Sequence, residues 1–122
     1  MSNYRNHFMS HIKTTIGELL EKLEQHNWRH SVYVNEPEDT SIHTVCFVID
    51  TDSAELENDV FTPSIAAQNG LREFLPVHDL QGVREYLANV GVSGTPEAEL
   101  FAIMHYFKWD TYPSERELAA YQ

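Results

Sequence analysis

Lysine and arginine are scarce in this sequence, and one long stretch has neither. The 122 residues include 8 Lys or Arg against 19 Asp or Glu, which gives a net charge of −11 at pH 7. A field of that sign repels phosphates and anionic lipids and attracts cations, so it disfavours nucleic acid and membranes as partners. No basic residue falls between Arg29 and Arg72, whereas the same interval holds eight carboxylates: Glu36, Glu38, Asp39, Asp50, Asp52, Glu55, Glu57 and Asp59.

Cysteine and long apolar runs are also lacking. The single cysteine, Cys46, cannot form an internal disulfide and lies in an apolar run, so we expect a small core residue. No apolar run approaches the roughly 20 residues that span a bilayer, and the N-terminal MSNYRNHFMSH has no apolar signal-peptide segment. These absences predict a cytoplasmic protein.

Motifs for enzymatic chemistry are missing as well. The sequence has no nucleophile elbow (G-x-S-x-G), no phosphate-binding loop (G-x-x-x-x-G-K-S/T) and no H-E-x-x-H segment. Asp50 and Asp52 begin like a calcium loop, but Ala54, Glu55 and Phe61 replace a ligand, the turn glycine and the closing glutamate. We therefore predict no catalytic residue, no metal and no cofactor.

Histidines leave an enzymatic alternative open. Two histidine pairs, His7 with His11 and His26 with His30, have a four-residue spacing that would align them on one helix face. A metal site would need a third ligand, which neither pair has nearby in the sequence. A small hydrolase or other enzyme could instead use one histidine with a carboxylate. The candidates for that role are His43, His78 and His105.

The unbroken apolar run from Val45 to Ile49 is the centre of the expected fold. It is short and rich in β-branched residues, which is typical of a strand covered on both faces. We expect it within a strand at 42–49, forming an antiparallel hairpin with a strand at 31–34. A third strand is expected at 71–77, and helices are expected at 15–25, 62–68, 79–91, 96–112 and 114–121.

Capping patterns define where these helices should begin. Thr15 with Glu18 and Ser114 with Glu117 both match the capping box, while Thr62 before Pro63 and Asp79 are expected N-caps. The resulting class is α+β, a small sheet of about three strands with three to four helices mostly on one face. We predict a single domain over 1–122, in which residues 1–11 are either a frayed lead-in or an early helical turn.

Recognition chemistry fits this composition better than a reaction. The carboxylates can accept hydrogen bonds from arginine and lysine side chains of a partner. Trp109 and Tyr112, near the end of the last long helix, are large rigid side chains of the kind that dominates interface energies. Trp28 and Tyr33 are further candidates of this kind.

Four segments resemble small immunity proteins of contact-dependent inhibition and related bacterial toxin systems. They are IGELLEKL (16–23), CFVIDTD (46–52), AAQNGLREFL (66–75) and ELFAIMHYFKWD (99–110). The resemblance implies a small acidic cytoplasmic protein that binds a cognate toxin domain, frequently a basic nuclease, and blocks its active site or substrate groove. It transfers no binding residue by position, so the site residues rest on the charge argument.

The leading hypothesis is therefore a non-enzymatic immunity protein, a monomer or weak dimer when free. Its expected contact residues are the eight carboxylates of the basic-free interval together with Trp109 and Tyr112. The acids at 36–39 and those at 50–59 should leave opposite ends of the strand at 42–49, so they form one surface only if the later segment folds back. Besides the enzymatic alternative, a regulatory subunit that pairs through the aromatic side of the last helix remains open.

Overall fold

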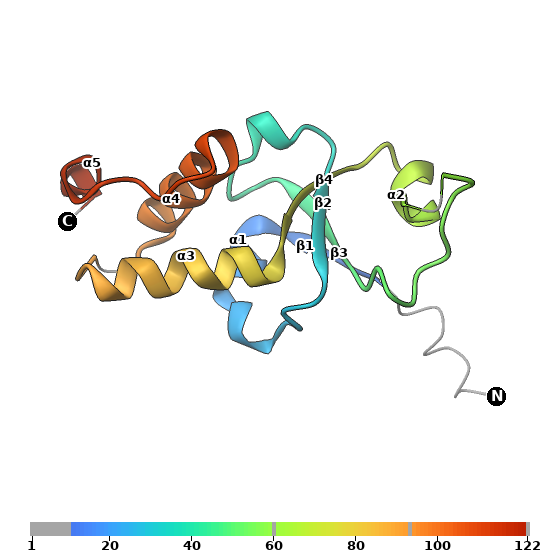
Figure 1. Ribbon diagram of the computed structural model, residues 1–122, viewed down its shortest axis with the longest axis horizontal. Helices are drawn as coiled ribbons and strands as arrows, with labels where there is room; N and C mark the ends of the chain where they lie inside the picture. The colour runs from blue at the N-terminus through green and yellow to red at the C-terminus, as the bar shows by residue number, and fades with distance from the viewer. Residues whose placement is uncertain (1–10, 60, 93, 122) are drawn as a thin grey trace.

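A four-stranded antiparallel sheet forms the middle of the molecule (Figure 1). The computed structural model describes residues 11–59, 61–92 and 94–121. In the sheet the strand order is β1-β3-β2-β4. The bounds are β1 (His11–Thr15), β2 (Ser31–Val34), β3 (Val45–Ile49) and β4 (Arg72–Pro76). The α+β class is confirmed.

Strand β3 is the interior strand that the apolar run predicts. It pairs with β1 on one side and β2 on the other, and alternate side chains enter two different clusters. Cys46 and Val48 face the main core, and Cys46 is fully buried, as expected. Phe47 and Ile49 face the opposite side of the sheet and are also buried.

The expected number of about three strands omitted β1. Only one residue of the HIKTT segment, Ile12, is apolar, so the strand has no visible alternation. As an edge strand, β1 buries few side chains. It is held by backbone hydrogen bonds to β3, which a pattern of apolar residues does not reveal. The lead-in expected at 1–11 and the pair of His7 with His11 fall mainly on residues outside the described ranges.

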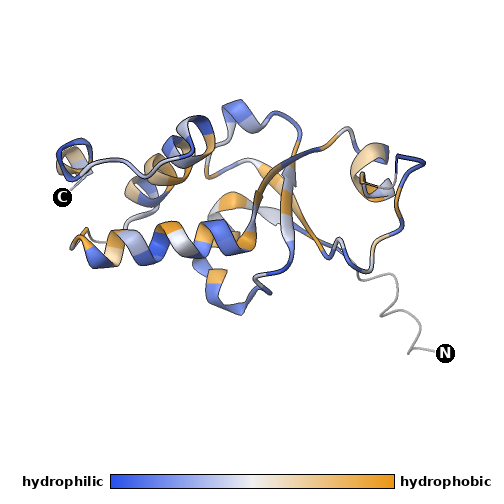
Figure 2. Ribbon diagram, viewed as in Figure 1, coloured by the Kyte–Doolittle hydropathy of each residue, from blue (hydrophilic) through white to orange (hydrophobic). Residues whose placement is uncertain are grey.

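One face of the sheet carries the main helical layer (Figures 1 and 2). It contains α1 (Ile16–Glu21), α3 (Val77–Asn89) and α4 (Pro96–Trp109), with the 3₁₀ turn η2 (Leu23–Gln25) after α1. Their apolar side chains pack on Val32, Cys46 and Val48 of the sheet. The chain ends in α5 (Glu115–Leu118) and η4 (Ala119–Tyr121), where Leu118 is fully buried.

The other face is covered by one short helix, α2 (Ser64–Gln68). Ala66 of this helix packs with Tyr33, Phe47, Ile49 and Leu71 in a second, smaller cluster. Figure 1 shows α2 on the far side of the strands from α3, α4 and α5. The helices are thus mostly on one face, as predicted, with α2 as the exception.

The capping patterns were right at two helix starts and wrong at two. Thr15 Oγ1 accepts a hydrogen bond from Glu18 N, and Ser114 with Glu117 forms a complete capping box. Thr62 does not cap α2, which begins at Ser64 after Pro63. Asp79 lies in the first turn of α3 rather than before it.

The start of α3 needs no side-chain cap because another segment satisfies its backbone. Val77 N donates to His30 O at 2.8 Å and His78 N donates to Trp28 O at 3.2 Å. These carbonyls take the place of a capping oxygen for two otherwise orphaned N–H groups. The helix therefore follows β4 directly, which sequence reasoning could not foresee.

Helix ends and other boundaries differ slightly from expectation. Helix α4 ends at Trp109 rather than near residue 112, because Asp110 has φ 57° in the left-handed region. The expected stops at Gly70 and Gly91 are confirmed, with φ of 63° and 78° respectively. Within the described ranges, no helix is long and apolar enough to cross a membrane.

Candidate functional site

The acidic segment begins where β3 ends, with a turn built around Asp50. Its carboxylate accepts hydrogen bonds from Asp52 N at 3.2 Å and Ser53 Oγ at 2.9 Å. Ala54 N bonds back to Asp50 O at 2.9 Å, and the Ala54 side chain packs against the cluster under α2. Asp50 thus directs the chain away from the sheet, while Asp52 points out on an exposed turn.

The chain then forms a narrow excursion at 55–64, which we name the acidic hairpin. Ser64 N donates to Glu55 O and Glu57 N donates to Thr62 O, both at 2.7 Å, on either side of the bridge between Leu56 and Pro63. These bonds hold the two arms side by side. The excursion is therefore a built hairpin rather than an irregular loop.

Asp59 fixes the turn of the acidic hairpin. Its Oδ1 accepts from Phe61 N at 2.9 Å and Thr62 N at 3.0 Å, and its Oδ2 accepts from Thr62 Oγ1 at 2.8 Å. The two backbone donors, followed by the hydroxyl, lower the pKa of this carboxyl. Asp59 was predicted as a partner contact, and the structure gives its carboxylate internal hydrogen bonds.

The acidic hairpin exposes two apolar side chains that sequence analysis did not select. Phe61 is 82% exposed and Leu56 is 40% exposed. Phe61 is more exposed than the other large apolar side chains of the described residues. The signal was available in the sequence: a lone aromatic between Asp59 and Pro63, within an acidic stretch and outside the expected strands and helices.

Most acids of this segment form no ion pair with another described residue. Among the described residues, no salt bridge involves Asp52, Glu55, Glu57 or Asp59. Asp50 Oδ2 lies 3.8 Å from His30 Nε2, the one such contact of the segment in these ranges. Arg84 pairs with Glu24 and Glu99, two acids outside the basic-free interval. The hairpin acids therefore lie exposed in water.

The acids at 36–39 lie at the other end of β3. The β2–β3 connection contains the 3₁₀ turn η3 (Pro37–Asp39), with Glu36, Glu38 and Asp39 exposed. Because β3 has five residues, its two ends are about 13 Å apart. Glu38 Oε1 also pairs with Arg72 Nη2 at 3.2 Å. The structure thus places the two acidic groups at opposite ends of the strand.

Two of the predicted aromatic contacts, Trp109 and Tyr112, lie on the helical side of the sheet. Trp109 is 69% exposed at the end of α4, and Tyr112 is 38% exposed just beyond it. Trp28 is 56% exposed, whereas Tyr33 is buried under α2, and burial raises its pKa to about 12. The structure does not bring Tyr112 together with the acidic hairpin, because they belong to opposite faces of the sheet.

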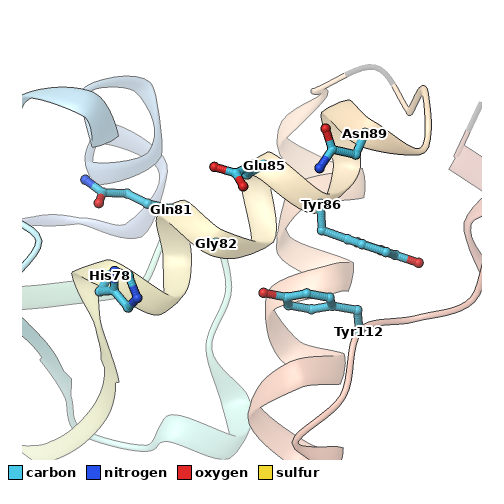
Figure 3. A pocket seen from close by; sticks show the side chains of 7 residues that line it. All are labelled: His78, Gln81, Gly82, Glu85, Tyr86, Asn89 and Tyr112. Carbon is cyan, nitrogen blue, oxygen red and sulfur yellow. The ribbon is translucent and has the colours of Figure 1, made fainter.

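Tyr112 forms one wall of a groove along α3 (Figure 3). The groove has a volume of about 440 Å³ and runs past His78, Gly82, Glu85 and Asn89. The Tyr112 ring stacks on Tyr86 at 4.6 Å, and its hydroxyl would lie 3.1 Å from a Cβ at Gly82. Glycine thus leaves the room that the hydroxyl occupies. The lining mixes polar and apolar surface, and no salt bridge among the described residues joins its histidine to its glutamate.

Two histidines of the described residues lie near a carboxylate: His30, whose Nε2 is 3.8 Å from Asp50 Oδ2, and His105, which joins two helices. His105 Nδ1 lies 2.7 Å from Thr111 O, and Nε2 lies 3.3 Å from Glu117 Oε2. Glu117 simultaneously accepts from Ser114 N, and this bond, with Ser114 Oγ and His105, lowers the pKa of its carboxyl. Both ring nitrogens are therefore engaged in holding α5 on α4, which is a structural arrangement.

The other two histidines proposed for catalysis, His43 and His78, form no salt bridge with a described carboxylate. His43 and His78 are exposed, and the ring of His78 lies edge-on to Trp28 at 5.8 Å between centroids. Across the described residues, no group of three or more His, Cys, Asp or Glu side chains is placed to hold a metal ion. No cofactor site is apparent from these side chains.

Fold and surface together define the class: an α+β domain with a helical layer on one face of its sheet and an acidic, apolar-tipped hairpin on the other. The chain belongs to the family described as a domain of unknown function, DUF7716, whose model matches residues 13–114. That range includes the whole acidic hairpin and extends from the middle of β1 to Ser114, the N-cap of α5. No curated protein and no solved structure matches the chain.

Proposed function

We propose that this protein is a non-enzymatic binding protein whose acidic hairpin docks on a basic partner protein. The observation that supports this best is Phe61, 82% exposed at a hydrogen-bonded turn among carboxylates that have no ion pair in the described ranges. Fully burying such a side chain contributes about 1.5–3 kcal/mol. A basic surface with an apolar pocket would complement both features.

Preorganisation of the hairpin favours binding over a merely solvated loop. Asp59 fixes the turn, and the bonds between Glu55 and Ser64 and between Glu57 and Thr62 fix the arms. A loop that is already ordered loses less conformational entropy on docking, so more of the contact energy is available as affinity. The hairpin is anchored by Ala54 and Ile65, which pack on the small cluster.

The resemblance to immunity proteins suggests the class of the partner. We propose a cognate toxin domain, of basic nuclease type, whose active site or substrate groove the hairpin occludes. Carboxylates would then occupy positions that nucleic-acid phosphates otherwise take, and the net charge of −11 would accelerate encounter. Such a partner acts on intracellular nucleic acid, which makes the cytoplasm the proposed compartment.

Association kinetics with a basic candidate partner, sought first among the products of neighbouring genes, test the proposal. The association rate should fall steeply as salt rises, since the screening length is only about 8 Å at physiological ionic strength. The double variant Asp52→Lys, Glu57→Lys should associate at least tenfold more slowly while its unfolding free energy changes by less than about 0.5 kcal/mol. A rate independent of salt and of this variant would refute docking through the acidic hairpin.

A matched pair of variants separates local charge from net charge. Glu21→Lys with Glu85→Lys changes the net charge by the same amount, but both positions lie on helices of the opposite face. We expect only a small decrease in association rate for this control. A larger loss here than in the hairpin variant would move the interface to the helical side.

Single aromatic substitutions test the anchor. Phe61→Ser should increase the dissociation rate at least tenfold, whereas Trp109→Ser, another exposed aromatic, should change it little. The reverse result would favour pairing through the aromatic side of α4. Stoichiometric inhibition of the partner's nuclease activity by the wild-type protein, reduced in Phe61→Ser, would link docking to neutralisation.

A further inference from the structure

Strand β1 leaves one edge of the sheet open within the described residues. It is the first strand in the order β1-β3-β2-β4, so β3 covers only one of its sides. Ile16 N donates to Thr44 O at 2.9 Å, which sets the alternation of the ladder. By that alternation the backbone groups of Ile12 and Thr14 point to β3, and those of His11 and Lys13 point to the open edge.

A groove follows this open edge on the helical side. Its volume is about 360 Å³. Residues 12–14 of β1 line it together with Glu18, Lys22, Gln25 and His26 from the segment of α1 and η2. Ile12 is 47% exposed there, although its cross-strand neighbour Val48 is buried. An added strand would cover Ile12 and place alternate side chains in the groove.

The edge is cationic, unlike most of the chain. Lys13 projects to the other face of the sheet, with its Nζ 5.9 Å from the centre of the Phe47 ring, and Lys22 lines the groove. The one carboxylate in the lining, Glu18, accepts a hydrogen bond from Thr14 Oγ1 at 3.3 Å. Two lysines therefore flank a strand edge in a protein of net charge −11.

We propose that the open edge of β1 binds an extended segment of another protein, in which apolar and acidic residues alternate. The segment adds a fifth strand to the sheet through the outward backbone groups of Lys13 and His11. Its apolar side chains lie beside Ile12 in the groove, and its acidic side chains lie beside Lys13 on the other face. Backbone bonds supply affinity and the alternation supplies specificity.

Charge selects this occupant over a second copy of the chain. Two β1 strands paired antiparallel about Lys13 would place the two ammonium groups directly opposite each other, which destabilises a strand pair. Lysine on an edge strand is a common device against such self-pairing. An acidic segment turns the same lysine into a favourable cross-strand contact. The site is separate from the acidic hairpin, so each can fail without the other.

The probe is a synthetic octapeptide of alternating valine and glutamate, titrated into the full-length ¹⁵N-labelled protein. We expect saturable shifts of the His11, Lys13 and Thr15 amides with a dissociation constant no weaker than roughly 1 mM, equivalent to about −4 kcal/mol. A valine–lysine peptide, and the valine–glutamate peptide N-methylated at alternate residues, should bind at least fivefold more weakly. N-methylation removes the donors that an added strand needs.

Four substitutions assign the binding to the edge. Lys13→Glu should weaken the valine–glutamate peptide at least fivefold, whereas Lys108→Glu, an exposed lysine on α4, should leave it unchanged. Lys13→Pro removes an outward N–H and should also abolish binding without unfolding the sheet, unlike Thr14→Pro, which removes a bond to β3. If Lys13→Pro does not fold, Lys13→Glu still decides the question.

Several outcomes would overturn the proposal. The first two are an absence of amide shifts at about 1 mM peptide and amide shifts confined to elements other than β1. The third is equal binding of the valine–lysine or N-methylated peptide. The fourth is a concentration-dependent dimer that Lys13→Glu abolishes. The last result would make a second copy the occupant. Neither the Lys13 variants nor the peptide should alter salt-dependent binding of a basic partner at the acidic hairpin.

Discussion

The two faces of the sheet differ in how much apolar surface they bury. On the helical face, nineteen buried residues from the sheet, from the helices and from the segments that connect them form one cluster, whereas the cluster under α2 has five. Burial of apolar area is the main favourable term in folding. Stability therefore resides mainly in the helical face, while the α2 face has the smaller task of positioning the acidic hairpin.

The two faces also differ in whether their carboxylates are buried and paired or exposed to solvent. On the helical face Glu99 is only 3% exposed, and Arg84 binds its two carboxylate oxygens at 2.6 and 2.7 Å and also Leu20 O at 2.6 Å. These bonds to Glu99 raise the pKa of Arg84 despite partial burial. On the α2 face the carboxylates stay in water. The core of the helical face satisfies its buried carboxylate with hydrogen bonds, whereas the proposed docking surface keeps its charges accessible.

The largest effect should come from breaking the buried ion pair. Arg84→Ala leaves the Glu99 carboxylate buried without its partner, which should cost about 3–5 kcal/mol of unfolding free energy. Arg72→Ala is the matched control, because the Arg72–Glu38 pair is exposed on both sides and should contribute about 0–1 kcal/mol. Urea unfolding measures both, and similar losses for the two variants would contradict the contrast between faces.

Core truncations should separate global from local stability. Leu80→Ala in α3 should cost about 2–5 kcal/mol in global unfolding. Leu71→Ala, in the small cluster, should lie at the low end of that range and act mainly by local opening. Hydrogen exchange should then show faster exchange in α2 and the acidic hairpin with little change in α3 and α4. Uniform loss of protection in both variants would make the two clusters one cooperative unit.

Acid should loosen the acidic hairpin. The pKa of Asp59 is lowered in the folded state, so its contribution is present above the ordinary value of 3.8 and is lost as pH falls through the lower folded pKa. The amides of Phe61 and Thr62 should lose protection in that acidic window. In Asp59→Ala they should be unprotected at neutral pH as well. Protection that is unchanged by acid and by the variant would show that other contacts hold the turn.

The smallest effect should be that of Phe61 on stability. Because its side chain is 82% exposed, Phe61→Ser should change the unfolding free energy by no more than about 0.5 kcal/mol. Thermal unfolding of the two proteins at equal concentration measures this. A loss of 2 kcal/mol or more, roughly that of a buried phenylalanine, would mean that Phe61 packs on the domain in solution and is not presented for docking.

Local patterns predicted those elements that local physics decides. The strands at Ser31–Val34 and Val45–Ile49 follow from short apolar runs, and the Ser114 capping box from a fixed four-residue pattern. β1 was missed because an edge strand needs little apolar signal of its own. Asp79 was misassigned because backbone carbonyls of His30 and Trp28, distant in sequence, satisfy the first N–H groups of α3.

By itself, the sequence determined the α+β class, the buried central strand with Cys46, and an acidic interval without basic residues. Those properties depend on composition and on periods of two to four residues, which are local. Only the tertiary structure decided that Tyr112 faces a groove on the helical side and that Phe61 projects from a built hairpin. The reason is that these relations depend on how distant segments pack across the sheet.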